Sequence, residues 1–188
     1  WRVVARNIFD MVKRNVNEEV ELLPRAEIET NMAEIGNVLK DKCVFITGAA
    51  GSIGSEMVRQ IAGYGPSHMV LIDQAETPMH DLEVQAKWPD VKTEYLVTTI
   101  TNKERMAKAF EMWHPDYVFH AAAYKHVPMM EQDPSSSVMN NVVGTRIMAD
   151  LAVANGVKKF VMVSTDKAVN PTNVMGCSKR LCEIYVPA

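Results

Sequence analysis

The chain has 188 residues, of which 47% are hydrophobic and 23% are charged, a composition that fits one globular domain and excludes an intrinsically disordered chain. The formal net charge of −3 gives no reason to expect nucleic acid as a partner, and no apolar run reaches the roughly 18 residues of a membrane span. The three cysteines show no CxxC spacing, which argues against disulfides and a zinc site and favours the reducing cytoplasm.

Residues 1–40 differ from the rest of the chain and are predicted to form a linker or an arm that lies on the domain. Val4, Ile8, Met11 and Val12 recur at helical spacing beside basic residues, which favours a solvated helix face. The acidic segment that follows is interrupted at Pro24 and becomes weakly helical up to residue 41. Because the chain begins without a methionine, we expect it to be a piece of a longer protein.

Residues 41–188 alternate short apolar runs with longer amphipathic segments. Strands are predicted at 43–47, 69–73, 95–97, 117–120 and 160–164, and several lack apolar/polar alternation, as parallel strands buried on both faces do. Helices are predicted at 52–62, 77–87, 103–113, 135–155 and 173–186. Repeated strand–helix–strand units with right-handed crossovers predict an α/β fold with a doubly wound parallel sheet, the Rossmann fold.

A glycine-rich loop joins the first predicted strand to the first predicted helix. Its glycines permit a tight turn and close backbone approach to a pyrophosphate, and the helix amides that follow favour negative charge. The residues expected to bind a dinucleotide there are Gly48, Gly51, Ser52, Ile53 and Gly54. Asp73 closes the second strand 19 residues after Gly54, near the roughly 20 expected of an acid that binds a ribose. Its carboxylate favours NAD over NADP, although a nearby basic residue can reverse that preference.

The motif HAAAYKHVP (120–128) follows the fourth predicted strand. Ala121, Ala122 and Ala123 leave room for a flat cofactor at the carboxyl end of that strand. Histidines recur every six residues from position 114 to 126, a spacing that suits neither one helix face nor a tight metal-binding loop. We therefore expect no metal site.

Asp166 and Lys167 follow the fifth predicted strand in a loop fixed by Pro171. Both side chains can turn toward the same crevice there and act as a proton-transfer pair. A lysine that serves as a base near neutral pH needs its pKa lowered by about three units, at a cost of roughly 4 kcal/mol. Burial beside a cofactor could supply that shift, whereas in an exposed loop the two side chains would form only an ion pair.

Five segments in this order resemble the extended short-chain dehydrogenase/reductase superfamily: ITGAAGSIGSE (46–56), LIDQAE (71–76), HAAAYKHVPMME (120–131), NNVVGT (140–145) and STDKAVNPTNVMGCSKR (164–180). Within it they resemble the nucleotide-sugar 4,6-dehydratases of bacterial polysaccharide biosynthesis, chiefly UDP-N-acetylglucosamine 4,6-dehydratase. The resemblance runs from about residue 22 to residue 185. It implies a lyase with a UDP-sugar substrate, in which NAD(P) oxidises carbon 4, water leaves across carbons 5 and 6, and the hydride returns to carbon 6.

The same resemblance implies roles for individual residues. Asp166 would protonate the departing 6-hydroxyl and Lys167 would be the base at carbon 5. Thr165 would meet the sugar's 4-oxygen, Lys179 would hold the nicotinamide ribose, and Asn141 would brace the fourth and fifth strands near the cofactor. We further expect Ile100 to contact the cofactor, and Lys125 and Asn173 to contact the substrate.

Two positions depart from the superfamily pattern. Met175 stands where the superfamily's tyrosine falls, and a thioether cannot take a proton from the 4-hydroxyl, so Asp166 or Lys167 must contribute there. Methionine at this place is typical of the long, membrane-anchored branch, which implies membrane spans upstream of residue 1 and work at the cytoplasmic face of the inner membrane. Thr99 stands where most relatives have an aspartate, so that expected adenine contact is missing.

Other functions remain open beside the dehydratase. A sugar-nucleotide 4-epimerase is the runner-up, although epimerases rely on the tyrosine that Met175 replaces, and a nucleotide-binding module without turnover is the third reading. Because extended members carry a carboxyl-terminal substrate lobe, we expect the 188-residue chain to bind the cofactor and turn over poorly. The resemblance also implies a homo-oligomer, formed through the helices at 135–155 and 173–186.

Overall fold

The computed structural model describes residues 32–186, with side chains from residue 35 onward. The helical spacing near the start of the chain and most of the predicted arm therefore lie outside the described residues. The described end of the arm is helix α2 (Met32–Leu39). Leu39 is buried in the core and Ile35 packs against it, so α2 lies on the domain.

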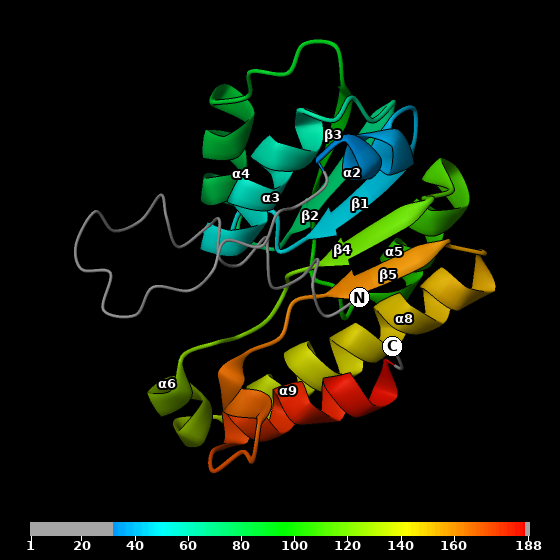
Figure 1. The fold of residues 1–188 in the computed structure, drawn as a ribbon. Helices are drawn as coiled ribbons and strands as arrows, with labels where there is room; N and C mark the ends of the chain where they lie inside the picture. Colours follow the sequence, from blue (N-terminus) through cyan, green and yellow to red (C-terminus); the bar gives the residue numbers. More distant parts are fainter. Residues whose placement is uncertain (1–31, 187–188) are drawn as a thin grey trace.

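Five parallel strands form one sheet in the order β3-β2-β1-β4-β5 (Figure 1). Their bounds are β1 (Cys43–Thr47), β2 (His68–Asp73), β3 (Lys92–Val97), β4 (Tyr117–His120) and β5 (Lys159–Met162). Thr47 at the end of β1 pairs with Ile72 on one side and His120 on the other. The strand order runs outward in both directions from β1, so the predicted doubly wound Rossmann sheet is confirmed and its switch point lies between β1 and β4.

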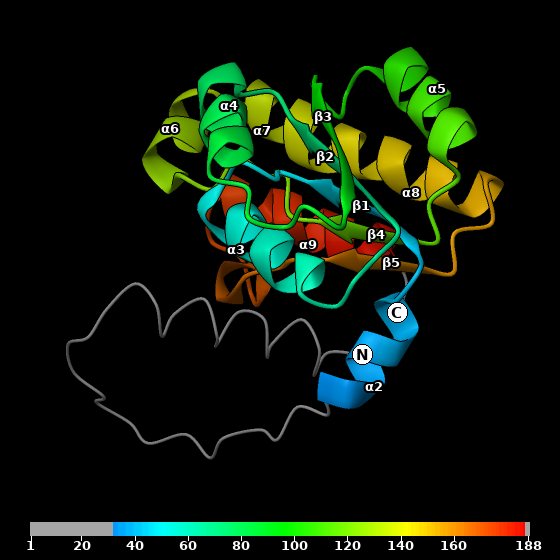
Figure 2. The same ribbon diagram turned by 90° about the horizontal axis from the view of Figure 1, so that it is seen from above.

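Helices cover both faces of the sheet (Figure 2). Val44, Ile46 and Leu71 belong to a core cluster that includes α3 (Ser52–Ala62) and Met79 of α4 (Glu76–Val84). Phe45 and Val70, at alternate positions of the same strands, belong to a second cluster with α5 (Lys103–Trp113) and α8 (Gly144–Ala154). Alternate strand residues thus feed two apolar layers, as burial on both faces requires.

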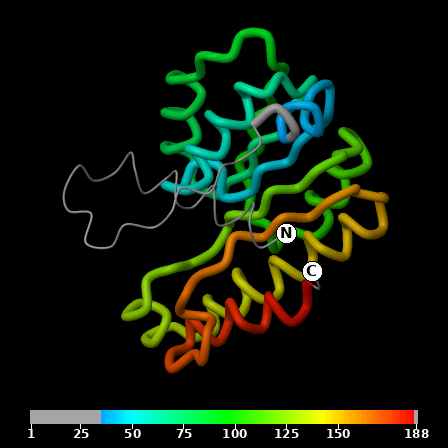
Figure 3. Tube along the Cα trace, in the orientation of Figure 1, coloured from blue at the N-terminus to red at the C-terminus, as the bar shows by residue number. Residues whose placement is uncertain are grey.

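Short helices surround the segments that leave β4 and β5. After β4 come α6 (Val127–Gln132), α7 (Pro134–Ser137) and the π-helix η1 (Val138–Val143). After β5 come the 3₁₀-helix η2 (Asp166–Ala168) and α9 (Val174–Tyr185). Figure 3 shows the two segments running away from the sheet toward the same end of the molecule, where α6 meets the start of α9. The helix predicted over 135–155 is therefore three consecutive helical segments, and α6 was not predicted.

Candidate functional site

A cavity of about 220 Å³ opens at the carboxyl ends of the strands, where a doubly wound sheet places its ligand. Its wall is made by the end of β2, by the loops that follow β1 to β4 and by one residue of η1. The lining residues are Gly48, Ala50, Gly51, Ile72, Asp73, Gln74, Ala75, Thr98, Thr99, Ile100, Ala121, Ala122, Ala123, Tyr124 and Asn140. The cavity thus brings together seven of the residues expected to bind a cofactor, namely Gly48, Gly51, Asp73, Ile100, Ala121, Ala122 and Ala123.

The chain turns from β1 into α3 so tightly that two glycines, one in the loop and one in the first turn of α3, cannot be replaced without a clash. Gly48 has a φ of +68°, and a β-carbon there would lie 2.6 Å from the backbone nitrogen of Ala122. A β-carbon at Gly54 would lie 1.9 Å from the carbonyl oxygen of Gly48. These contacts bring the loop against the segment after β4 and fold it under the first turn of α3.

The amino-terminal end of α3 points its backbone amides to this loop. Ser52, Ile53 and Gly54 form its first turn, which has no side-chain cap and no acidic residue. The ammonium of Lys125 lies 3.2 Å from the hydroxyl oxygen of Ser52. Ser52, Ile53, Gly54 and Lys125 do not line the cavity themselves, but they lie next to Gly51, which does. Uncapped amides, the positive end of the helix dipole and a lysine together make the space beside Gly51 suited to an anion such as a diphosphate. Lys125, expected at the substrate, thus lies beside the phosphate loop.

The carboxylate of Asp73 joins two loops of the cavity wall. One oxygen accepts a hydrogen bond from the amide of Ala50 at 3.1 Å, and the other accepts from the amide of Ala75 at 3.0 Å. These bonds fix the carboxylate, and each oxygen keeps a further lone pair for a ligand hydroxyl. No lysine or arginine of the described residues lines the cavity beside it.

Asn141 is fully buried and does not line the cavity. Its side-chain oxygen accepts from the amide of Tyr124 at 2.8 Å, while its nitrogen donates to the carbonyl of Tyr124 at 3.0 Å and to the hydroxyl of Ser178 at 2.9 Å. It therefore braces the segment after β4 against α9. The residue that does reach the cavity is its neighbour Asn140, which sequence reasoning missed and whose only signal is the paired asparagine in NNVVGT.

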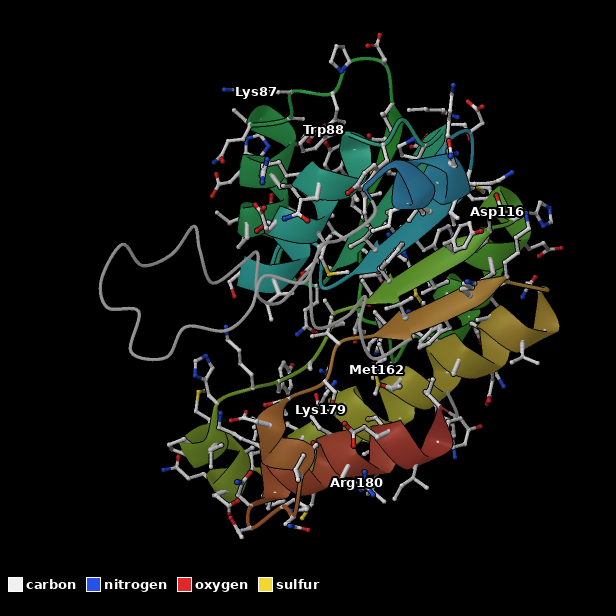
Figure 4. The ribbon with its side chains drawn as sticks, in the orientation of Figure 1. Lys87, Trp88, Asp116, Met162, Lys179 and Arg180 are labelled. Atoms are coloured by element: carbon white, nitrogen blue, oxygen red, sulfur yellow. The ribbon has the colours of Figure 1, made fainter. Side chains whose placement is uncertain are left out.

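Lys179 and Met175 lie one turn apart on α9 and are both buried, with 5% and 3% of their surfaces exposed. The ammonium of Lys179 donates to the carbonyl of Val163, just past β5, at 2.7 Å. Burial lowers the pKa of this lysine. In Figure 4, Lys179 points from α9 toward the sheet, whereas Arg180 points outward. Neither Lys179 nor Met175 lines the cavity.

Thr165, Asp166 and Lys167 lie at η2, outside the cavity. The threonine hydroxyl donates to the Asp166 carboxylate at 2.9 Å, and the Lys167 ammonium lies 4.0 Å from the same carboxylate. The Asp166 side chain is 92% exposed and that of Lys167 is 51% exposed. The Thr165 hydrogen bond and then the Lys167 charge lower the pKa of Asp166. The described residues thus present these two as an exposed ion pair, without the burial that a lysine base needs.

Asn173, an expected substrate contact, is the N-cap of α9. Its side-chain oxygen accepts from the amide of Gly176 at 2.8 Å, and the Glu131 carboxylate of α6 accepts from the amide of Val174 at 2.6 Å. Both bonds satisfy amides of the first helical turn, which otherwise lack partners. The side chain of Asn173 thus has a structural use, and its contact with a substrate stays a prediction.

Gln74 and Tyr124 are further cavity residues that sequence reasoning missed. The Gln74 amide donates to the Tyr124 hydroxyl at 3.0 Å and joins the loop after β2 to the loop after β4. Their positions, directly after Asp73 and after Ala123, are the signal that was available.

Within residues 32–186, no helix is long and apolar enough to cross a bilayer, and no three His, Cys, Asp or Glu side chains gather as a metal site requires.

Three curated proteins illustrate the sequence relatives of the chain. It is 40% identical to the capsular polysaccharide biosynthesis protein CapD of Staphylococcus aureus, over 90% of this chain and 29% of CapD. It is 34% identical to the UDP-N-acetylglucosamine 4,6-dehydratase (inverting) of Campylobacter jejuni, over 73% of this chain and 40% of that enzyme. It is 35% identical to the UDP-glucose 4-epimerase of Rickettsia canadensis, over 76% of this chain and 42% of that enzyme. The chain thus spans less than half the length of each of these relatives.

Solved structures share the same fold. Pen from Bacillus thuringiensis is 34% identical and superimposes with a TM-score of 0.73, over 79% of this chain and 44% of Pen. WbmG from Bordetella bronchiseptica, in complex with NAD and UDP, is 24% identical with a TM-score of 0.64, over 76% of this chain and 48% of WbmG. A model of the family described as polysaccharide biosynthesis protein matches residues 44–188. The chain therefore belongs to this polysaccharide biosynthesis family, within the extended short-chain dehydrogenases/reductases.

Proposed function

We propose that the chain is the cofactor-binding part of an NAD-dependent nucleotide-sugar 4,6-dehydratase that acts on UDP-N-acetylglucosamine in bacterial polysaccharide biosynthesis. The observation that carries this proposal is the cavity itself, which the phosphate loop, Asp73 and the three alanines after β4 line together. The C. jejuni 4,6-dehydratase, 34% identical over 73% of the chain, supports the choice of reaction.

The residues in and beside the cavity suit the parts of a dinucleotide. Gly48 and Gly54 leave a cradle that β-carbons would fill, and the uncapped start of α3 with Lys125 beside it suits the two phosphates. Asp73 would accept hydrogen bonds from the adenosine ribose, and Asn140 and Ala121–Ala123 would contact the rest of the cofactor. NAD, when bound, supplies a reversible hydride acceptor.

Asp73 also supports NAD over NADP. A ribose 2′-phosphate would bring negative charge to a carboxylate that two backbone amides already hold in place. The described lining of the cavity contains no lysine or arginine to offset that repulsion. We therefore propose NAD as the working cofactor and NADP as a weaker ligand.

Proton transfer is the proposed work of Asp166 and Lys167. Asp166 would donate to the 6-oxygen as it leaves, and Lys167 would take the proton from carbon 5, with the Thr165 hydroxyl placed at the 4-oxygen. A sugar nucleotide lying over the exposed pair would displace water from both. Loss of water raises the pKa of a carboxyl group and lowers that of an ammonium, which are the directions that a general acid and a general base require.

The test is to incubate the 188-residue chain, and separately the full reading frame that contains it, with UDP-N-acetylglucosamine and NAD and to follow the sugar by NMR. We expect the 4-keto-6-deoxy sugar from the full reading frame and little from the chain alone, which spans 40% of the C. jejuni enzyme. Asp166→Asn and Lys167→Ala in the full reading frame should each abolish most turnover. Absence of product from the full reading frame would reject the dehydratase assignment, and near-normal turnover in both variants would reject the two roles.

A 4-epimerase is the second candidate, because the R. canadensis UDP-glucose 4-epimerase is 35% identical over 76% of the chain. The same NMR experiment separates the two, since an epimerase inverts the 4-hydroxyl and keeps the 6-hydroxyl. Met175 favours the dehydratase: it is buried at the place of the superfamily's tyrosine and carries no proton to exchange.

Self-association is a further part of the proposal. Apolar side chains are exposed on the helices expected to mediate it, with 53% of Met139 exposed on η1, 83% of Val153 on α8, and 50% of Leu181 and 66% of Ile184 on α9. Burying such side chains between two copies would remove apolar surface from water. We propose that these helices form a homo-oligomer, which sedimentation analysis would test: a chain that stays monomeric at high concentration contradicts it.

A further inference from the structure

The imidazole of His120 joins three segments around the cavity through hydrogen bonds that the proposed chemistry does not use. His120 ends β4 and has no exposed surface. Its Nδ1 lies 2.7 Å from the hydroxyl oxygen of Thr47, and its Nε2 lies 2.9 Å from that of Thr145. Both threonines are buried as well, so the three side chains form a closed polar row between β1, β4 and α8.

Each end of this row adjoins the cavity wall. Thr47 directly precedes Gly48, and its hydroxyl also accepts a long hydrogen bond of 3.5 Å from the amide of Ala122. His120 directly precedes Ala121, which lines the cavity. Thr145 follows Gly144, whose missing β-carbon would lie 2.5 Å from Cδ1 of Ile100, another lining residue. The row therefore ties the segments that contain the lining residues Gly48 and Ala121 to the start of α8, which packs against the lining residue Ile100.

The hydrogen bonds and the neutral charge of the His120 ring hold the three side chains of the row in fixed positions. A neutral imidazole has one nitrogen that donates and one that accepts, and a threonine hydroxyl can do either, so both nitrogens are paired in either tautomer. Burial, and after it the positive charge of Lys179, lower the pKa of His120 to about 3, which keeps the ring neutral at physiological pH. The ring also packs against Phe160 at a centroid distance of 5.5 Å. With both nitrogens bonded and no water access, rotation of the ring would leave buried polar atoms unpaired.

We propose that His120 is a positioning residue of the cofactor cavity, and that the Thr47–His120–Thr145 row holds the phosphate loop, the Ala121–Tyr124 segment and the start of α8 at the spacing that a dinucleotide needs. This inference rests on the proposed function, in which the cavity holds NAD. A positioning role differs from a role in overall stability, because loss of the row should loosen the cavity wall and weaken NAD binding while the rest of the domain stays folded.

The test compares Thr145→Val, which keeps the shape of the side chain and removes the hydroxyl, with Thr145→Ser, which restores the hydroxyl. Leu39→Ala is the matched control, because Leu39 is buried beside the amino end of β1, away from the cavity. The readouts on the 188-residue chain are the dissociation constant for NAD by calorimetry and the amide hydrogen exchange of residues 48–51 and 121–124 by mass spectrometry. Thr47→Val tests the other end of the row if Thr145→Val does not fold.

We expect Thr145→Val to weaken NAD binding by about tenfold and to speed exchange in both segments, since a buried ring nitrogen loses its partner. Thr145→Ser should restore both readouts, and Leu39→Ala should lower the melting temperature with both unchanged. Unchanged affinity and exchange in a folded valine variant, or equal effects of Leu39→Ala, would overturn the inference. If the wild-type chain fails to bind NAD, the proposed function fails, and the exchange of the two segments still decides the role of the row.

Discussion

Gly54 and Gly48 pack backbone to backbone, so closely that a β-carbon on Gly54 would lie 1.9 Å from the carbonyl oxygen of Gly48. This contact folds the loop after β1 back under the first turn of α3. It places the amides of that turn beside the cavity, where the segment after β4 forms the opposite wall. The two glycines thus connect a backbone requirement of the fold to the site for phosphate.

The first prediction separates two effects of replacing Gly48, the clash of a new β-carbon with neighbouring backbone and the strain of a positive φ. Gly48 and Gly65 have φ of +68° and +66°, so alanine costs roughly 1–2 kcal/mol of conformational strain at either position. Only at Gly48 would the new β-carbon meet backbone, 2.6 Å away, because nothing lies within 4 Å of the corresponding point at Gly65. Gly48→Ala should therefore abolish measurable NAD binding by calorimetry. Equal affinities of the Gly48→Ala and Gly65→Ala chains would contradict this reading of the loop.

The second prediction concerns the choice of cofactor. Asp73→Asn keeps a carbonyl oxygen as acceptor for one of the two amide bonds and removes the charge. Affinity for NADP should rise relative to NAD by about tenfold, because the repulsion of a 2′-phosphate is lost. Asp81→Asn, on α4 and away from the lining residues, is the control and should leave the ratio unchanged. Calorimetric titration with both dinucleotides measures the ratio, and an unaltered ratio in Asp73→Asn would refute the role of Asp73.

The third prediction follows from the lowered pKa of His120, about 3 in the folded chain against 6.5 for an unperturbed histidine. Between these values the unfolded chain binds the extra proton, so stability is complete above pH 6.5 and declines as the pH falls toward 3. From pH 7 to pH 5.5 this histidine should remove about 1 kcal/mol from the free energy of unfolding. His68, whose pKa burial and Lys92 also lower, contributes in the same direction.

Urea unfolding of the wild-type chain and of His120→Gln at the two pH values isolates the contribution of His120. His68 and the carboxyl groups are common to both chains and cancel in the difference between them. The wild-type chain should lose about 1 kcal/mol more than the variant between pH 7 and pH 5.5. Equal losses would mean that His120 is not held neutral by its surroundings.

The fourth prediction compares two neighbouring cations on α9. Lys179 is buried and donates to the carbonyl of Val163, whereas Arg180 is exposed and pairs with Glu183. Lys179→Met removes a cation placed at the end of β5, so NAD affinity should fall by about tenfold. Arg180→Met removes an exposed ion pair and should change affinity less than twofold. If both variants bind NAD equally well, Lys179 has no part in the cofactor site.

Local patterns were enough to predict most of the fold. The bounds predicted for β1, β4, α3 and α5 match the structure, because the two strands are short buried apolar runs and the two helices bury one face at helical spacing. Helix α6 was missed because its first turn contains Pro128, which reads as a loop residue although proline suits the first positions of a helix. The π-helix η1 was missed because an inserted wider turn preserves the apolar spacing on both sides of it.

The candidate site was predicted in part, and the limit is set by contacts between distant residues. The glycines and Asp73 belong to one strand–loop–helix–strand unit, from β1 to the end of β2, and spacing along the chain describes such a local unit well. The bonds of Asn141 to Tyr124 and Ser178 span 17 and 37 residues, so the family resemblance implied its bracing role, whereas no local pattern could identify these partners or point to Asn140 as the cavity residue. The exposure of Asp166 and Lys167 likewise depends on what packs over η2, which spacing along the chain does not specify.

The most direct test of the central claim is calorimetric titration of the 188-residue chain with NAD and, in parallel, with NADP. We expect one saturable site for NAD, weaker binding of NADP, and loss of binding in Gly48→Ala but not in Gly65→Ala. A wild-type chain that is folded by circular dichroism and binds neither dinucleotide would contradict it.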